Sequence, residues 1–367
     1  MMKTACSANV ALLTTKNAGH RRTVPTVSVV FAAALGVVAG PASALTIKPV
    51  FDSSITSRSN AGQIETAFRS VASIFDHALS SSATINIQVS WGRVGGSALP
   101  SGVIGASRDN LYSGLNFSQI RRYLTSSATR NPLDTSFAAD VKTLPTTAPP
   151  GLNSYALPSA QAKALGLIAG NQTSYDGYIG FNSAASYDYS VTTAIRGAYD
   201  FYAVAAHEID EVLGRVTGLD DSTPSFRSVL DLYRYAAPGK MSFAYTSAAY
   251  LWLNKGSTNL GAFNVLGAGD RSDWKSGLKD AQLAYLPTGI TAPFGSSDWK
   301  ILDALGWTQA KSVYLDGTTT TTAPGGVDYA LGVPEPGAWT MILAGLAFGG
   351  AAVRRRRAAP AIRQSVH

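Results

Sequence analysis

The stretch AVAAHEIDEVLGR, residues 203–215, constrains the fold more than any other part of the chain. It starts with apolar and small residues, which favour a helix inside the protein, yet His207, Glu208 and Glu211 follow at once. On a helix His207 and Glu211 are i and i+4, about 40° apart around the axis, so their side chains project toward the same point. Charged groups are costly to bury without partners, so this helix predicts one half of a metal site.

The helix is expected to run from Ala198 to Leu213 and to end at Gly214, which can adopt the left-handed conformation of a helix end. Glu208 is rotated by about 100° from His207 and lies at the edge of the same face, where a general base for water would have to be. The stretch also allows a simpler interpretation. Glu211 and Arg215 are i and i+4 as well, a favourable spacing for a surface ion pair.

The N-terminus has the pattern of a secretory signal. A basic region closes at Arg22, an apolar stretch follows from Val24 to about Gly40, and Ala42-Ser43-Ala44 is a small-residue cleavage site. We therefore expect the mature chain to begin near Leu45. The single cysteine, Cys6, lies in the removed segment, so the mature chain is expected to have neither disulfides nor thiolate metal ligands.

The C-terminus reads VPEPGAWTMILAGLAFGGAAVRRRR, an apolar run from Ala338 to Val353 followed by four arginines. The run is short for a stable membrane span, which needs about 20 residues, but the arginines would hold its end on the cytoplasmic side. The Pro-Glu-Pro entry, the apolar run and the arginines resemble the PEP-CTERM sorting tag of Gram-negative bacteria. This resemblance implies transient contact with the inner membrane, cleavage by an exosortase, and release toward the cell surface or extracellular matrix.

The formal net charge of +7 belongs to these two ends. Nine of the 30 basic residues but only one of the 23 acidic residues lie in residues 1–44 and 333–367, so the body between them is nearly neutral. A nearly neutral body argues against nucleic-acid binding.

Hydrophobic periodicity predicts an α+β arrangement around the central helix. Helices are expected at 62–79, 117–124, 159–168 and 296–307, strands at 84–92, 102–107, 173–183 and 250–256, and a surface loop at 144–150. The run 228–239 is apolar and aromatic, and a Gly/Asp-rich passage through Asp273-Trp274 follows the strand at 250–256.

Zinc catalysis needs three protein ligands and an open position for water. His-Glu-x-x-His supplies two ligands and a base on one helix, and here Glu211 stands at the second ligand position, giving His-Glu-x-x-Glu. A carboxylate is an acceptable zinc ligand, so the substitution leaves the chemistry in place.

The third ligand is expected to be a carboxylate, because the chain has only four histidines. His20 and His367 lie in the terminal segments, and His77 is predicted to be a surface or capping residue. Asp231, 20 positions after Glu211, is the preferred candidate because thermolysin-type peptidases have a similar separation. The other candidates are Asp220 and Asp221, which follow Thr217 at the metzincin ligand position, while Tyr233 and Tyr235 are candidate phenols near the metal.

The stretch resembles a family of secreted, PEP-CTERM-tagged, zincin-like metalloproteases that carry His-Glu-Ile-x-Glu-Val-x-Gly-Arg. The match consists of His207, Glu208, Ile209, Glu211, Val212, Gly214 and Arg215. It extends to TINIQVSWG at 84–92, DGYIGF at 176–181, LDLYRYAAPG at 230–239 and LDALGW at 302–307, and covers roughly residues 60–307. The resemblance implies zinc peptidase activity.

The predicted architecture is a single α+β, zincin-like domain of metzincin or gluzincin type at 45–312, with a mixed sheet and a central active-site helix. A signal peptide at 1–44 precedes it, and a Thr/Gly/Pro-rich spacer at 313–332 and the sorting tag at 333–367 follow it. The expected function is hydrolysis of a peptide or protein substrate, with Zn²⁺ held by His207, Glu211 and Asp231 and with Glu208 as general base. The alternative is a non-catalytic cell-surface or matrix protein with a zincin-like fold, in which Glu211 pairs with Arg215.

Overall fold

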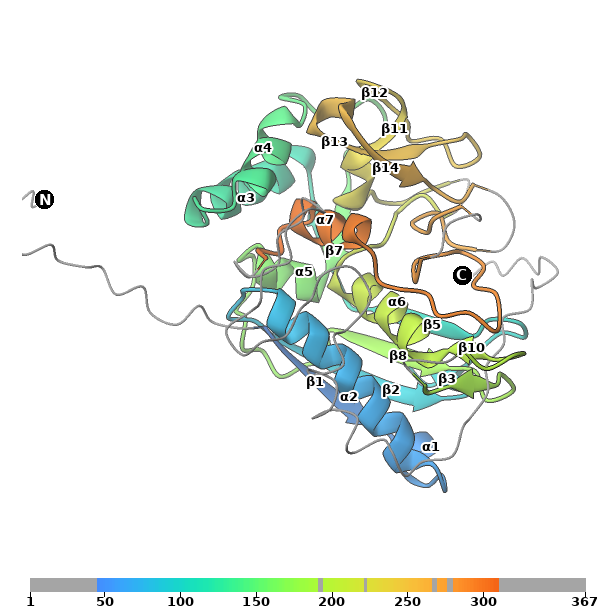
Figure 1. Ribbon diagram of the computed structural model, residues 1–367. Helices are drawn as coiled ribbons and strands as arrows, with labels where there is room; N and C mark the ends of the chain where they lie inside the picture. Colours follow the sequence, from blue (N-terminus) through green and yellow to red (C-terminus); the bar gives the residue numbers. More distant parts are fainter. Residues whose placement is uncertain (1–44, 191–193, 221–222, 266–268, 276–279, 310–367) are drawn as a thin grey trace, which may run out of the picture. The chain divides into compact units, whose positions relative to one another are not determined.

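A computed structural model describes residues 45–190, 194–220, 223–265, 269–275 and 280–309 (Figure 1). The chain divides into two units, residues 1–40 and 41–367, and every described residue belongs to the second. The predicted signal peptide, spacer and sorting tag lie outside the described residues. None of the helices in the described ranges is long and apolar enough to cross a membrane.

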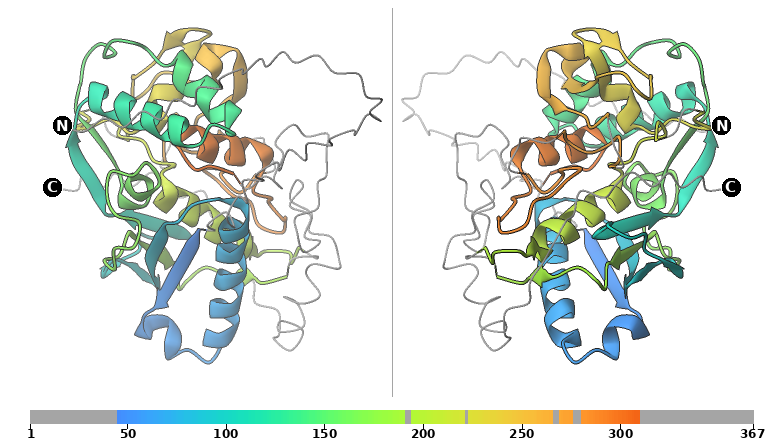
Figure 2. Two further views of the ribbon diagram at one scale, coloured as in Figure 1. Left: turned by 90° about the vertical axis from the view of Figure 1, so that its left-hand side faces the viewer. Right: turned by 90° about the vertical axis from the view of Figure 1, so that its right-hand side faces the viewer.

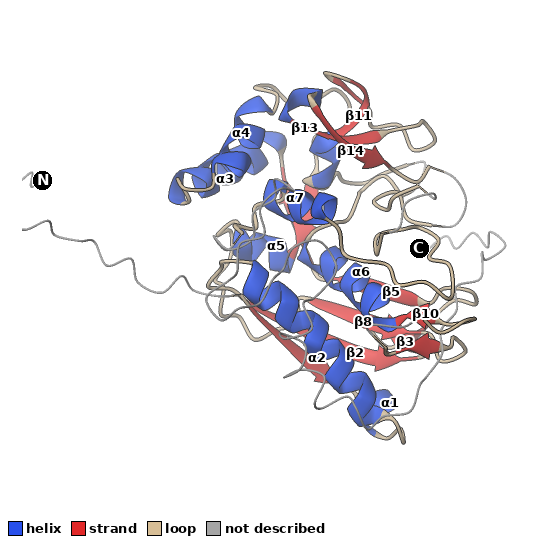
Figure 3. Ribbon diagram, viewed as in Figure 1, coloured by secondary structure: helices blue, strands red, loops and turns tan. Residues whose placement is uncertain are grey.

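The main sheet is mixed, as predicted. It has four strands in the order β1-β2-β8-β5 (Figure 3). Strands β1 (Thr46–Phe51), β2 (Thr84–Trp91) and β8 (Gly177–Phe181) are parallel, whereas β5 (Gly105–Asp109) runs antiparallel to β8 at one edge. The predicted strands at 84–92, 102–107 and 173–183 are therefore confirmed with shifted ends, while β1 was not predicted.

Two helices cover one face of this sheet. Helix α2 (Ala61–Ala78) packs on β1 and against α6 (Phe201–Leu213), and α6 in turn packs on β5 and β8. Figures 1 and 2 show the two helices on the same face. The 3.6-residue period of α2 buries one apolar stripe, and the alternation of β2 buries Ile85, Ile87 and Val89. Tight packing of helix against sheet is what gives α6 a fixed position.

Helix α6 starts three residues later than predicted. The Asp200 carboxylate accepts a hydrogen bond from the backbone N–H of Ala203 at 3.1 Å and so caps the helix at its first turn. At the other end, Gly214 has φ +131° and its N–H bonds the carbonyls of Asp210 and Glu211, as the sequence predicts. Trp307 also donates its indole N–H to the carbonyl of Leu213 at 2.7 Å.

A second sheet, in the order β12 (Lys240–Met241), β11 (Arg234–Ala237), β13 (Tyr250–Leu253) and β14 (Thr258–Ala262), lies further along the chain. Helix α3 (Phe117–Arg130) extends beyond its predicted end, α5 (Ser159–Ala164) is shorter than predicted, and α4 (Thr135–Thr143) was not predicted. The remaining elements are α1 (Ser53–Thr56), β3 (Arg93–Val94), β4 (Ser97–Ala98), β6 (Leu111–Leu115), β7 (Tyr155–Pro158), β9 (Tyr187–Asp188), β10 (Tyr199–Asp200), η1 (Leu230–Tyr233), η2 (Asn254–Gly256) and α7 (Ser296–Ala304). The loop at 144–150 and the helix that begins at Ser296 are confirmed.

Candidate metal centre

Helix α6 places three of the predicted site residues together. His207, Glu208 and Glu211 are buried, with exposed fractions of 4%, 2% and 6%, and their possible ligand atoms lie within 4.8 Å of one another. Glu211 also belongs to a second group of this kind with Asp270 and Asp273, which precede α7. Asp273 is buried and Asp270 is exposed. The two groups meet at Glu211.

The distances around His207 are those of a metal ligand set. Its Nε2 atom lies 3.6 Å from Oε1 of Glu211 and 3.4 Å from Oδ1 of Asp273. Two ligands bound about 2.0–2.1 Å from a tetrahedral zinc are roughly 3.3–3.4 Å apart. The spacing of the imidazole from each of the two carboxylates is therefore close to that of two ligands on one zinc ion.

The backbone of a neighbouring segment orients the imidazole. Nδ1 of His207 lies 3.1 Å from the carbonyl oxygen of Ala281, which can only accept, so Nδ1 carries the proton in this contact. Gln282 donates its side-chain N–H to the carbonyl of His207 at 3.2 Å. Nε2 is thereby directed at the two carboxylates, as in metal-binding histidines whose second nitrogen is held by a carbonyl.

The carboxylates also affect the protonation of His207 and, through it, that of Glu211. Burial lowers the pKa of His207, but the charges of Asp273 and Glu211 outweigh this effect and raise that pKa to about 10. Burial acts against ionisation of Glu211, yet hydrogen bonding and attraction from His207 lower its pKa overall. Without a metal ion the centre therefore holds a proton at neutral pH, which a bound cation would displace.

The edge strand β5 closely approaches α6 beside Glu208. A Cβ atom on Gly105 would lie 2.3 Å from Oε1 of Glu208 and 2.7 Å from Cγ1 of Val204. Two residues further along the same strand, Ser107 forms a side-chain hydrogen bond with Glu211. Glycine at position 105 is therefore what allows the Glu208 carboxylate to occupy the space between helix and strand.

The structure does not bring Asp231 to this centre, contrary to the prediction. Its Oδ1 accepts a hydrogen bond from the hydroxyl of Thr217, and its Oδ2 accepts from the backbone N–H groups of Gly218 at 3.0 Å and Ser228 at 2.8 Å. Asp231 belongs to neither group of possible metal ligands among the described residues. Asp231 therefore closes the loop that follows α6. Its separation from Glu211 in the sequence did not predict this, because such a separation does not determine the path of a loop.

Among the described residues, the other candidates belong to neither group of possible metal ligands, although Asp220 lies near enough to Asp273 and Glu211 for their charges to add to the effect of burial and raise its pKa. Asp220 accepts the backbone N–H of Arg271 at 2.9 Å, and the phenol of Tyr233 donates to the carbonyl of Ala304 at 3.0 Å. Asp221 lies outside the described residues, and Tyr235 is buried in β11. His77 is exposed in the last turn of α2, as predicted.

The proposed ion pair between Glu211 and Arg215 does not form. Arg215 lies beyond the end of α6, is fully buried, and pairs with Asp298 at 2.5 Å and with Asp210 at 3.6 Å. The left-handed turn at Gly214 ends the helix before Arg215, so helical spacing does not apply to it.

Sequence reasoning did not identify Asp273. The only signal was the Gly/Asp-rich passage that contains it, which lies 66 positions after His207. An aspartate in a loop of this kind is ordinarily interpreted as a turn residue.

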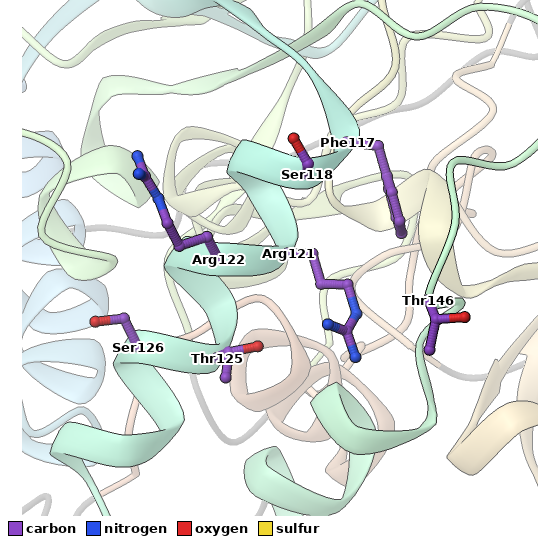
Figure 4. Close-up of a pocket in the computed structure, with 7 residues that line it drawn as sticks. All are labelled: Phe117, Ser118, Arg121, Arg122, Thr125, Ser126 and Thr146. Carbon is purple, nitrogen blue, oxygen red and sulfur yellow. The ribbon is translucent and has the colours of Figure 1, made fainter.

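A surface pocket lies elsewhere, along α3 (Figure 4). Its lining contains none of the predicted site residues and consists of Phe117, Ser118, Arg121, Arg122, Thr125, Ser126 and Thr146. In Figure 4 the side chains of Arg121 and Arg122 leave the helix on different sides, so they do not converge on one ligand.

No protein-family model, curated protein or solved structure matches the chain. The function therefore has to be inferred from the centre on α6 and its surroundings.

Proposed function

We propose that the protein is an exported, zinc-dependent peptidase. The observation that carries the proposal is the placement of Glu211 and Asp273 at 3.6 Å and 3.4 Å from Nε2 of His207, with Glu208 beside them. In this proposal His207, Glu211 and Asp273 hold the zinc ion, and Asp273 takes the role predicted for Asp231.

The donor set fits zinc. Nitrogen and carboxylate oxygen are ordinary zinc ligands, and three protein ligands that leave one position open are typical of catalytic sites. The segment that carries Asp273 also includes Asp270, whose carboxylate belongs with those of Glu211 and Asp273 to one group of possible metal ligands. When bound, zinc supplies Lewis acidity, which makes water a nucleophile near neutral pH and polarises a carbonyl.

Glu208 is the general base. Its carboxylate accepts a proton from the attacking water as the oxygen bonds to the carbonyl carbon. The same carboxyl then donates that proton to the amine nitrogen as the carbon–nitrogen bond breaks, so Glu208 returns to its starting state. Its confinement between α6 and Gly105 holds it beside the ligand set.

The main sheet supports a peptide substrate and a zincin-like fold. Among the described residues no strand pairs with the outer edge of β5. Such an edge can add an extended peptide as a further strand. A peptide bound there would pass Gly105 and Ser107, next to Glu208 and Glu211. Parallel strands followed by one antiparallel edge strand under the metal-binding helix support the zincin-like assignment.

The terminal segments complete the proposal. A cleaved signal at 1–44 exports the protein, and the tag at 333–367 brings it to an exosortase at the inner membrane. After cleavage the domain acts at the cell surface or in the extracellular matrix.

Metal analysis and a protease assay on the purified protein test the proposal. We expect one zinc ion per chain, loss of zinc in His207→Ala, and zinc retention with at least a 100-fold loss of peptide hydrolysis in Glu208→Gln, in line with the contribution of general bases. Full hydrolysis by Glu208→Gln, or no stoichiometric zinc in the wild type, would refute it. Zinc without any hydrolysis would favour the non-catalytic surface or matrix protein.

A further inference from the structure

Arg215 is a buried cation at the end of the metal-binding helix. Its side chain is fully buried, and it pairs with the carboxylates of Asp298 and Asp210. Burying an arginine is costly unless its charge is compensated and its donors are used. The two aspartates compensate the charge, and the remaining contacts of Arg215 show what else this residue does.

Those contacts are made to both neighbours of Asp273 in the chain. Nε of Arg215 donates to the carbonyl of Ser272 at 3.4 Å. Its guanidinium lies over the ring of Trp274, 4.5 Å from the ring centroid. The indole N–H of Trp274 donates to the same Asp298 oxygen that pairs with Arg215, at 3.1 Å. Arg215 therefore holds the segment on each side of the residue that faces His207.

The stack continues beyond Trp274. Phe263 stacks on Trp274 with ring centroids 5.9 Å apart and an interplanar angle of 27°, and the guanidinium of Arg234 lies 4.8 Å from the Phe263 centroid. Arg234 also donates to the carbonyl of Arg271 at 2.9 Å. The segment at 271–274 is thus held between a residue that follows α6 and a residue of β11.

We infer that Arg215 is a positioning residue, which fixes Asp273 at its distance from His207 through Ser272 and Trp274. The inference rests on the proposed metal centre. Because α6 supplies His207 and Glu211 and ends just before Arg215, one short part of the chain positions all three ligands. The planar guanidinium is needed because it donates in its own plane while its face stacks on an aromatic ring, and lysine can do only part of this.

Zinc affinity of the full chain tests the inference. Arg215→Lys keeps the charge but loses the stacking and the bond to Ser272, so we expect its Zn²⁺ affinity to fall about 10- to 100-fold, as for other residues that support metal ligands. Substitution of Co²⁺ for Zn²⁺ should show weaker visible absorption in the variant, because loss of one ligand moves the ion away from tetrahedral geometry. Affinity is measured by chelator competition at a temperature where circular dichroism shows the variant to be folded.

Trp274→Phe is the second variant, in case Arg215→Lys does not fold. It keeps an aromatic ring but removes the N–H that bonds Asp298, and we expect its Zn²⁺ affinity to fall about 10-fold. The matched control is Lys163→Arg, an exchange of buried cations in the ion pair with Asp176, whose side chains are both 1% exposed. This control should lose stability but keep the zinc affinity and the Co²⁺ spectrum of the wild type.

Wild-type affinity in the folded Arg215 and Trp274 variants would overturn the inference, as would an equal loss of affinity in Lys163→Arg. The proposed function fails separately. A wild-type protein that binds zinc but hydrolyses no peptide removes the peptidase proposal and leaves the role of Arg215 intact, whereas a wild type that binds no zinc removes both.

Discussion

Replacing Gly105 by alanine should impair the proposed base, Glu208, while leaving the proposed metal ligands in place. The added methyl group would lie 2.3 Å from Oε1 of Glu208, so the carboxylate has to retreat by roughly 1 Å to reach an ordinary contact distance. It would also lie 2.7 Å from Cγ1 of Val204, a stiff β-branched side chain on the same helix. The substitution therefore displaces the base and crowds the contact between β5 and α6.

The expected effects follow from these distances. Overpacking of this kind costs about 1–3 kcal/mol of folding free energy. A misplacement of about 1 Å can reduce catalysis by about 100-fold, which corresponds to about 2.7 kcal/mol on the barrier. Zinc content should stay at one ion per chain, because the atoms nearest to the added methyl group belong to Glu208 and Val204 and not to the three proposed ligands.

The assay measures hydrolysis, zinc content and thermal unfolding in three proteins. Gly177→Ala is the matched control, because its methyl group would lie 2.7 Å from Val212 on α6 and would crowd the same interface away from Glu208. It should lose similar stability and keep much more activity. If Gly105→Ala keeps wild-type activity, or loses activity only together with zinc, the role assigned to Glu208 is wrong.

Two further predictions concern residues outside the centre. Asp231→Ala removes the acceptor of the backbone N–H groups of Gly218 and Ser228, so it should lower the free energy of unfolding by about 1–3 kcal/mol but leave zinc content unchanged. Loss of zinc from the folded variant would restore Asp231 as a ligand. Burial and the nearby Asp134 raise the pKa of Asp303 from 3.8 to about 8. Between these two pH values the folded state keeps a proton that the unfolded state has lost. The contribution of Asp303 to the free energy of unfolding therefore falls as pH rises through this range. Asp303→Asn should remove that dependence. Its free energy of unfolding, measured in urea, should exceed that of the wild type by an amount that grows from pH 5 to pH 8 by up to about 1.4 kcal/mol per pH unit. An equal difference at both pH values would contradict this prediction.

Local patterns predicted the elements well where burial is periodic. The stripe of α2 and the alternation of β2 each depend on one face turned to the core, and such a face is visible in a few consecutive residues. The burial of strand β1 alternates, but the strand was missed because it contains Pro49, which is unusual inside a strand, and because the apolar Val50 is exposed. Helix α4 was missed because its buried positions, Phe137 and Val141, are too few for a periodic signal.

The sequence by itself determined the helical half of the centre. Helical geometry places residues i and i+4 on one face whatever surrounds them, so His207, Glu211 and the position of Glu208 follow from 203–215 alone. The glycine at 214 that ends the helix follows from the same stretch, because only glycine adopts φ +131° without strain.

Only the tertiary structure decided the rest of the centre. Asp231 lies in the short helix η1 and Asp273 in a loop, and nothing local to either residue distinguishes a carboxylate that closes a loop from one that faces an imidazole. The difference lies in long-range contacts, through which Thr217 and two backbone N–H groups occupy Asp231, while Arg215 and Trp274 direct Asp273 to His207. Loop paths depend on such contacts between distant residues, and sequence spacing does not record them.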